Sequence, residues 1–176
     1  FGPIVFPGKG YRIDDTLVIP ARTGIKVTGN GLTLWQVAGQ PQMGPVSRLV
    51  WHGPPGKPMV QYDGFGLHWE GVALFGRPRL PGGQKNRYQR ASCGLLLRGN
   101  DYGKGLGTAK IFVPTLAVCE CDVGIQFGTF ADQDVAGTKI GNPMNADNCV
   151  FGSLFLHNCD VGMLSVCSQT VGVVIQ

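Results

Sequence analysis

The feature that most constrains this chain is an internal repeat near its C-terminal end. When residues 111–125 (IFVPTLAVCECDVGI) are laid on residues 149–163 (CVFGSLFLHNCDVGM), fifteen positions align without a gap. Leu116 falls on Leu154, and the phrase Cys-Asp-Val-Gly at 121–124 falls on the same phrase at 159–162. Residues 128–148 between the copies are polar and rich in turn formers, which indicates an inserted loop. Without about fifteen loop residues the repeat length falls in the low twenties, which is typical of a solenoid.

Short segments of alternating apolar residues predict an all-β protein. They are bounded by Gly, Asn, Asp or Pro and are too short for helices, and the chain contains 28 Gly and 12 Pro. Three such strands cannot bury their own inner face, so we expect successive repeats to stack with parallel strands about 4.8 Å apart. The segments are Ile25 and Val27, Leu32 and Leu34, Leu67 and Trp69, Val72 and Leu74, Leu95 and Leu97, Ile125 and Phe127, and Val171, Val173 and Ile175.

Stacking predicts roles for the repeated residues. Cys121 and Cys159 would lie above one another in the interior, and Asp122 and Asp160 would occupy identical turns. We expect the glycine two positions after each Asp to supply a left-handed corner while the Asp bonds its own turn, so these carboxylates are interpreted as structural. The six cysteines lie in apolar patterns without a C-x-x-C pair, which favours buried free thiols over disulfides and argues against a metal site.

The start of the chain resembles the first coil of the pectate-lyase-like superfamily. Residues 4–31 (IVFPGKGYRIDDTLVIPARTGIKVTGNG) match its succession of a Val-x-Phe-Pro-x-Gly-x-Tyr-x-Ile phrase, a polar turn, Leu-x-Ile-Pro and a glycine-bounded strand. Residues 71–76, 93–100, 121–128 and 159–166 resemble later coils. The resemblance implies a single-stranded solenoid, the right-handed parallel β-helix, here with about six to seven coils in one domain over residues 1–176. Such domains usually begin with a capping stretch, so we expect the chain to be part of a longer protein.

The resemblance implies a protein that binds or acts on extracellular polysaccharide, as a lyase or a glycoside hydrolase, outside the cell or on a virion or cell surface. The same family includes phage tailspikes and proteins without demonstrated catalysis. A non-catalytic structural or adhesive segment of a phage tail, surface fibre or other assembly, including a homo-oligomer, is therefore the alternative. The sequence leaves open whether the chain is an enzyme.

The candidate catalytic residues are Asp132 and Asp134, in an inserted loop at about 129–147 that also holds Asp147. Paired carboxylates could serve glycoside hydrolysis or bind Ca²⁺, the one cofactor that the pattern suggests. An ordinary acidic loop is the alternative explanation of this cluster.

The candidate substrate-binding residues are basic and aromatic. A second inserted loop, at about 77–92, is basic and contains Arg77, Arg79, Arg87 and Arg90, and Trp51 and Trp69 stand beside His52 and His68 as candidate sugar platforms. A solvated loop and packed aromatic rings are the structural alternatives. The net charge of +4 is small for a dedicated nucleic-acid binder, and no apolar run is long enough to predict a membrane span.

Overall fold

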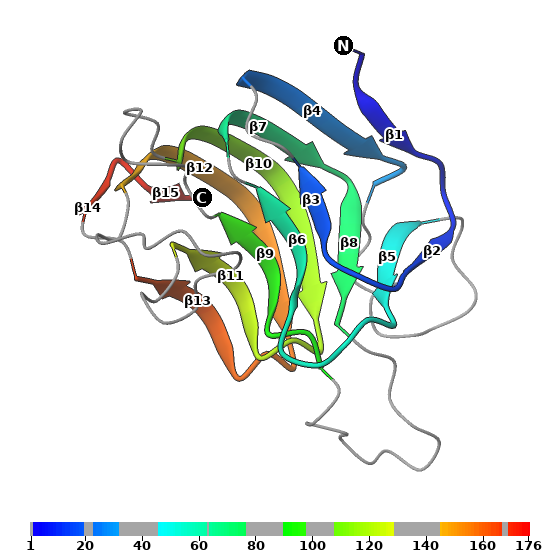
Figure 1. Ribbon diagram of the computed structural model, residues 1–176. Coiled ribbons are helices and arrows are strands. Elements are labelled where there is room, and N and C mark those ends of the chain that lie inside the picture. The colour runs from blue at the N-terminus through cyan, green and yellow to red at the C-terminus, as the bar shows by residue number, and fades with distance from the viewer. Residues whose placement is uncertain are drawn as a thin grey trace.

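The computed structural model describes residues 2–19, 23–31, 46–62, 64–76, 90–97, 108–128, 145–166 and 169–176. All regular structure in these ranges is β-strand, which confirms the all-β prediction (Figure 1). Within the same ranges there is no helix that could cross a membrane. The strands are β1 (Ile4–Phe6), β2 (Gly10–Ile13), β3 (Leu17–Ile19), β4 (Thr23–Gly29), β5 (Ser47–Trp51), β6 (Pro58–Tyr62), β7 (Phe65–Glu70), β8 (Val72–Phe75), β9 (Cys93–Leu97), β10 (Thr108–Cys119), β11 (Val123–Phe127), β12 (Asn145–His157), β13 (Val161–Ser165), β14 (Gln169–Val171) and β15 (Val174–Ile175).

The strands form two sheets in which the described neighbours all run parallel. The larger sheet has ten strands in the order β1-β4-β7-β10-β8-β5-β2, with β12 beside β10 and with β14 and β15 beside β12. The smaller sheet has the order β13-β11-β9-β6-β3. Figure 1 shows that the larger sheet is strongly curled, because the long β10 pairs with β7 along its first part and with β8 along its second.

The register of the sheets confirms the repeat found in the sequence. Strands β10 and β12 pair with Leu116 opposite Leu154, and β11 and β13 pair with Val123 opposite Val161. Both pairs join the residues that the sequence alignment of the two copies places together. Identical phrases therefore lie side by side in space, as predicted.

Some neighbouring strands are separated by only a short stretch of the chain. Ile4 pairs with Val27, and Ser47 pairs with Val72. At the other end of the large sheet β12 pairs with β14, with Asn145 opposite Gln169. The separation along the chain is in the low to middle twenties in all three cases. Because these neighbours are separated by little more than the strands themselves, the longer separations elsewhere contain inserted segments.

The boundaries of the two predicted loops differ from the structure. Strand β12 begins at Asn145, inside the loop expected at 129–147. In the loop expected at 77–92, the amide of Ser92 donates to the carbonyl of Lys57 and the carbonyl of Arg90 accepts from the amide of Gly56. The last residues of this segment are therefore attached to the neighbouring strand region, and its first part, residues 77–89, lies outside the described residues.

The core lies between the sheets and follows the predicted alternation. Val27, Leu67, Leu95 and Ile125 from four different strands all point inward and are at most 1% exposed. Large side chains from both sheets fill the same interior, including Trp51, Tyr62, Trp69 and Phe151. Apolar burial of this kind is the main favourable term that holds the parallel strands together.

The left-handed corners lie at other residues than predicted. Gly124 and Gly162 do not have positive φ; Glu120 and Asn158, which correspond to each other in the repeat, do, with φ of 60° and 52°. Gly124 is needed for a different reason, because a Cβ at this position would lie 2.5 Å from the carbonyl oxygen of Gly162. The repeated glycine thus permits a close approach of neighbouring strands, and asparagine and glutamate form the turn.

Candidate functional site

Five of the predicted site residues lie outside the described residues. These are the candidate catalytic pair Asp132 and Asp134 and three of the candidate substrate-binding arginines, Arg77, Arg79 and Arg87. Their roles stay predictions. The remaining three candidates are Trp51, Trp69 and Arg90.

The two tryptophans are core residues and cannot form a sugar platform. Both are 0% exposed, Trp51 at the end of β5 and Trp69 in β7. The indole Nε1 of Trp69 donates to the carbonyl of Val72 at 3.0 Å. Because strand alternation sends these rings inward, the structural alternative for both residues is correct.

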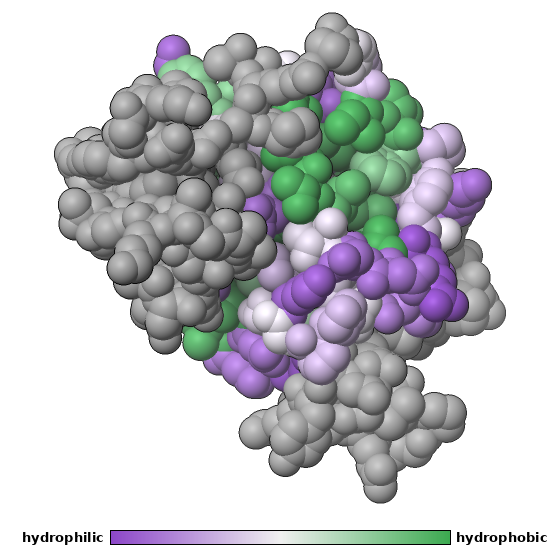
Figure 2. All heavy atoms as spheres, viewed as in Figure 1, coloured by the Kyte–Doolittle hydropathy of each residue, from purple (hydrophilic) through white to green (hydrophobic). Residues whose placement is uncertain are grey.

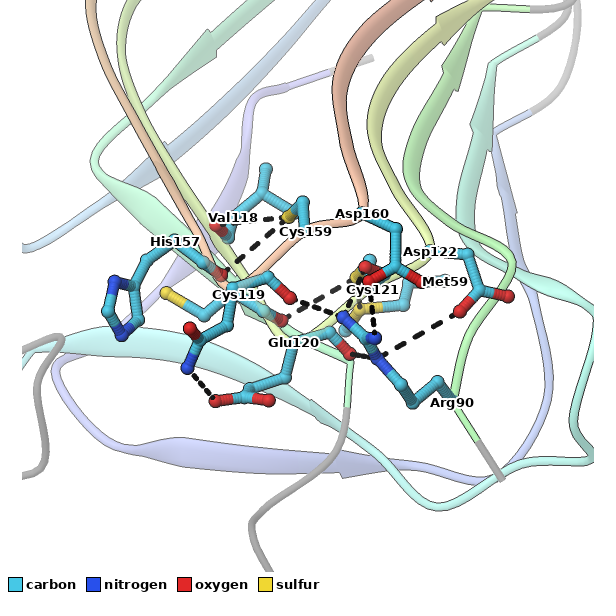
Figure 3. A network of polar contacts seen from close by, with 11 residues as sticks. Met59, Arg90, Val118, Cys119, Glu120, Cys121, Asp122, His157, Cys159 and Asp160 are labelled. Carbon is cyan, nitrogen blue, oxygen red and sulfur yellow. Dashed lines mark hydrogen bonds and ion pairs between the residues drawn. The ribbon is translucent and has the colours of Figure 1, made fainter. Parts of the chain in front are cut away.

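Arg90 is also buried, with 5% of its side chain exposed, so it is not available to a ligand (Figure 3). Its guanidinium donates from Nε to the carbonyl of Glu120 at 3.0 Å and from Nη2 to the carbonyls of Cys121 and Asn158. Nη1 donates to Oδ1 of Asp160 at 3.3 Å. A planar fork of donors is well suited to this task, and Arg90 ties two neighbouring turns together.

The two repeated aspartates have the structural role that was predicted, although through a different partner. Asp122 lies 3.9 Å from Arg90 Nε, and Asp160 lies 3.3 Å from its Nη1. The side-chain amide of Asn158 donates to Glu120 Oε1 at 2.7 Å, which links the same two turns again. Figure 3 shows Asp122 and Asp160 beside the buried guanidinium of Arg90.

The sulfur atoms near these turns are unsuited to nucleophilic chemistry. Cys121 is fully buried, with its Sγ 3.7 Å from Sδ of Met59, and Cys159 packs against the same apolar core. Cys93, Cys119, Cys121 and Cys159 are free thiols, as the sequence favours. Burial raises the pKa of Cys119 to about 12 and holds the pKa of Cys121 well above its ordinary value. At neutral pH these thiols stay protonated, and the thiolate is the reactive form.

An exposed column of side chains on the outer face of β4, β7, β10, β12 and β15 is the best candidate site. Lys26 pairs in register with His68, His68 with Phe112, Phe112 with Val150, and Val150 with Val174. Phe112 is 46% exposed, and the side chain of His68 is 30% exposed. From one strand to the next, the side chains of the column change from cationic to aromatic to aliphatic.

Polar groups surround the aromatic ring at the middle of this column. The ring of His68 meets Phe112 edge-to-face with 5.2 Å between centroids, and its Nε2 lies 3.2 Å from Glu70 Oε2. The Glu70 side chain is 47% exposed. On the same strand as Phe112, Lys110 has its Nζ 5.2 Å from the ring centroid of Phe65. An exposed apolar ring, a carboxylate and an imidazole therefore lie together, with Lys26 on the strand next to His68.

A second column, two residues before the first, consists of residues with left-handed backbone. The register of β4, β7, β10 and β12 aligns Gly24, Gly66, Lys110 and Asn148, whose φ angles are 72°, 86°, 56° and 52°, and Gly172, directly after β14, has a φ of 67°. A lysine at such a position costs about 1 kcal/mol relative to an unstrained one. Glycine adopts this conformation without strain, so Lys110 is the member of the column at which strain is expected.

The outer face of these strands is not predicted from the sequence. His68 stands there only as the neighbour of Trp69, and neither Glu70 nor Phe112 is among the candidate residues. Strand alternation was the available signal, because Phe112 stands between the inward residues Ile111 and Val113 and must point outward. What could not be seen is the register of β4, β7 and β10, because the repeat in the sequence relates only β10 to β12 and β11 to β13.

No group of three or more metal-ligating side chains occurs in the described ranges, so the Ca²⁺ suggestion, which depends on the loop at 129–147, stays a prediction. Comparisons with known proteins find no matching family model, no matching curated protein and no matching solved structure.

Proposed function

We propose that this chain is a right-handed parallel β-helix of the pectate-lyase-like kind that binds polysaccharide along the outer face of β4, β7, β10 and β12. Three features support the fold: the parallel pairing, the short and similar separations between loop-free neighbours, and the two sheets around one core. Parallel crossover connections are right-handed in nearly all proteins, which supports the hand. Such a protein would act outside the cell or on a virion or cell surface.

The observation that carries the proposal is the exposed ring of Phe112 with His68 and Glu70 beside it. Sugar rings have an apolar face that packs on aromatic side chains and hydroxyl groups that bond to carboxylate and imidazole. Lys26, the register partner of His68, and Lys110, on the strand of Phe112, would favour a glycan that carries carboxylates. The column crosses strands at steps of about 4.8 Å, so it suits an extended chain better than a single sugar.

Of the two reactions, the described side chains of this face favour elimination over hydrolysis. Glycoside hydrolysis needs two carboxylates on either side of the scissile bond, whereas Glu70 is the carboxylate that this face offers among the described residues. Elimination needs one base beside a sugar carboxylate that a cation neutralises, and His68 with Lys26 and Lys110 supplies these types of group.

The test is binding of defined polysaccharides by affinity electrophoresis and calorimetry, with polygalacturonate and alginate as acidic glycans and xylan as a neutral one. We expect Phe112→Ala to weaken binding about tenfold and Phe112→Tyr to retain it, because the aromatic face is the contact. Val18→Ala is the matched control, since Val18 is 52% exposed on the other sheet. No binding by the wild type, or equal binding by Phe112→Ala, would overturn the proposal.

The same samples test catalysis. Elimination creates a double bond with ultraviolet absorbance, and hydrolysis releases reducing ends. Binding without either signal would identify a non-catalytic carbohydrate-binding protein.

The second candidate function is a structural segment of a fibre or other assembly. The feature that favours it is the parallel stacking of strands around one apolar core, because stability of this kind does not depend on a ligand.

A further inference from the structure

The carboxylate of Glu70 has hydrogen-bonding capacity that the described residues do not use. Its Oε2 lies 3.2 Å from Nε2 of His68. Within the part of the chain that the structure describes, no hydrogen bond involves its Oε1, and the side chain is 47% exposed at the end of β7. A carboxylate can accept about four hydrogen bonds. Glu70 therefore retains acceptor sites for a ligand on the outer face.

Hydroxyl side chains stand on both sides of Glu70 in the register of the sheet. Thr28 of β4 pairs with Glu70, and so does Thr115 of β10, which in turn pairs with Ser153 of β12. These four residues are called the polar column here. It runs beside the column that contains the exposed aromatic ring, two residues further along β4 and β7 and three residues further along β10 and β12. A stripe of hydroxyl and carboxylate groups thus accompanies an aromatic stripe across the same strands.

An extra residue in β10 brings Thr115 opposite Glu70. Between the aromatic column and the polar column, β10 has one residue more than β7. Without it, Pro114 would stand opposite the carboxylate and offer neither a hydroxyl nor an amide hydrogen. Oγ1 of Thr115 accepts from the amide of Gly71 at 3.3 Å, so its hydroxyl hydrogen is left for a further partner. Bulges of this kind re-aim side chains and are over-represented beside active sites.

We propose that Glu70 is the specificity-determining residue of this face, and that it accepts hydrogen bonds from two neighbouring hydroxyl groups of the sugar that packs on Phe112. The inference rests on the proposed glycan binding. Two residues along β7 correspond to about 7 Å, so a sugar ring over the aromatic column extends its hydroxyl edge to the polar column. Thr28 and Thr115 occupy the equivalent places for the sugars before and after it, at steps of about 4.8 Å.

The role of Glu70 differs from that of the cations near it. Lys26, the register partner of His68, attracts a glycan that carries carboxylates, whereas the charge of Glu70 repels it. Any favourable contribution of Glu70 to the binding of an acidic glycan must therefore come from hydrogen bonds. A site built to bond a hydroxyl group discriminates strongly against an analogue that lacks it. The face should thus select acidic glycans whose neighbouring hydroxyl groups are free and reject those in which they are acylated.

The experiment compares polygalacturonate, which has two neighbouring free hydroxyl groups on each sugar, with the same polymer after O-acetylation. Binding to the full chain printed above is measured by calorimetry. Glu70→Gln keeps the size of the side chain and replaces one acceptor by a donor, and we expect it to bind polygalacturonate about tenfold more weakly. The acetylated polymer should bind the wild type about tenfold more weakly as well. Glu70→Gln should not weaken this second complex further, because the contact is already lost.

Asp14→Asn is the matched control for the change in charge. Asp14 lies in the turn between β2 and β3, where its side chain is 62% exposed and pairs with Arg12 at 2.7 Å. Figure 2 shows hydrophilic residues where Figure 1 places this turn, and β2 is far from β4 and β7 in the strand order of the large sheet. Removing this charge should leave the affinity for polygalacturonate unchanged or slightly higher.

Two results would overturn the inference while the proposed function stands, provided that Phe112→Ala still weakens binding. One is unchanged or tighter binding of polygalacturonate by Glu70→Gln, as charge alone predicts. The other is an equal loss for both polymers, because a residue that only holds His68 in place would affect both alike. A wild type that binds neither polymer would instead show that the proposed binding of acidic glycan is wrong, and this inference with it.

Discussion

Replacing Arg90 tests whether a buried cation joins the two repeated turns. The chosen change is Arg90→Met, which keeps the apolar stem of the side chain and removes its five N–H donors. The variant leaves the carbonyls of Glu120, Cys121 and Asn158 without this donor and leaves Asp160 without its cation.

The expected loss follows from the exposure of each partner. A hydrogen bond to a charged donor contributes about 1.5–3 kcal/mol, and breaking a buried pair typically costs about 3–5 kcal/mol. The side chain of Asp160 is 49% exposed, so its ion pair is screened by water and contributes less than about 1 kcal/mol. The loss therefore comes mainly from the carbonyls, and we expect Arg90→Met to lower the free energy of unfolding by about 3–5 kcal/mol. Asp160→Asn should lower it by under about 1 kcal/mol.

Urea denaturation monitored by tryptophan fluorescence measures both changes, because Trp51 and Trp69 are buried in the native state. Arg90→Lys should fall between the wild type and Arg90→Met, since a single ammonium group cannot reproduce the fork. A loss below about 1 kcal/mol for Arg90→Met, or an equal loss for Asp160→Asn, would refute the reasoning. Unchanged glycan affinity of folded Arg90→Lys would show further that this arginine does not contact ligand.

Three further predictions concern backbone geometry and ionisation. Gly124→Ala would place a Cβ 2.5 Å from a backbone oxygen and should lower the free energy of unfolding, measured by urea denaturation, by about 1–3 kcal/mol. In Gly162→Ala the new Cβ meets only the end of a leucine side chain at 3.3 Å, so an equal loss in this variant would contradict the explanation. Lys110→Gly relieves a φ of 56° and should stabilise the protein by about 0.5–1 kcal/mol, so a lower melting temperature would count against strain. Burial raises the pKa of Cys119 from 9.0 to about 12, so the unfolded thiol ionises first and the free energy of unfolding falls as pH rises between these values. Cys119 contributes at most about 1.4 kcal/mol per pH unit to this decrease. Cys119→Ala should therefore reduce the slope of the free energy of unfolding against pH between about pH 9 and 11, and an unchanged slope would disprove the raised pKa of Cys119.

The sequence predicted those parts of the fold that depend on local pattern. Alternation identified the inward residues of β4, β7, β8, β9 and β11, because a side-chain period of two follows from strand geometry alone. The internal repeat correctly paired β10 with β12 and β11 with β13, because the two copies carry nearly the same apolar positions.

The remaining features depend on contacts between segments that no local pattern relates. Arg90 reads as part of a basic loop, and only its approach to Glu120 and Asn158 shows that it is a buried cross-link. The aspartate and glycine of the repeated phrase suggested a glycine corner, whereas the left-handed residue precedes the phrase at Glu120 and Asn158. A glycine that permits close approach and a glycine that forms a corner look alike in a sequence.

Inner and outer columns on the same strands differ in what they contribute to the fold. Along β4, β7, β10 and β12 the inner column reads Val27, Trp69, Val113 and Phe151, so small and large apolar residues alternate and fill the interior. One residue away, the outer column changes from lysine to histidine, phenylalanine and valine. A register slip by a single position would exchange the two columns, so burial of the inner column fixes the register. Because the outer residues do not set the register, they can be exchanged without changing the fold, and the cationic and aromatic half formed by β4, β7 and β10 is where a ligand should be sought.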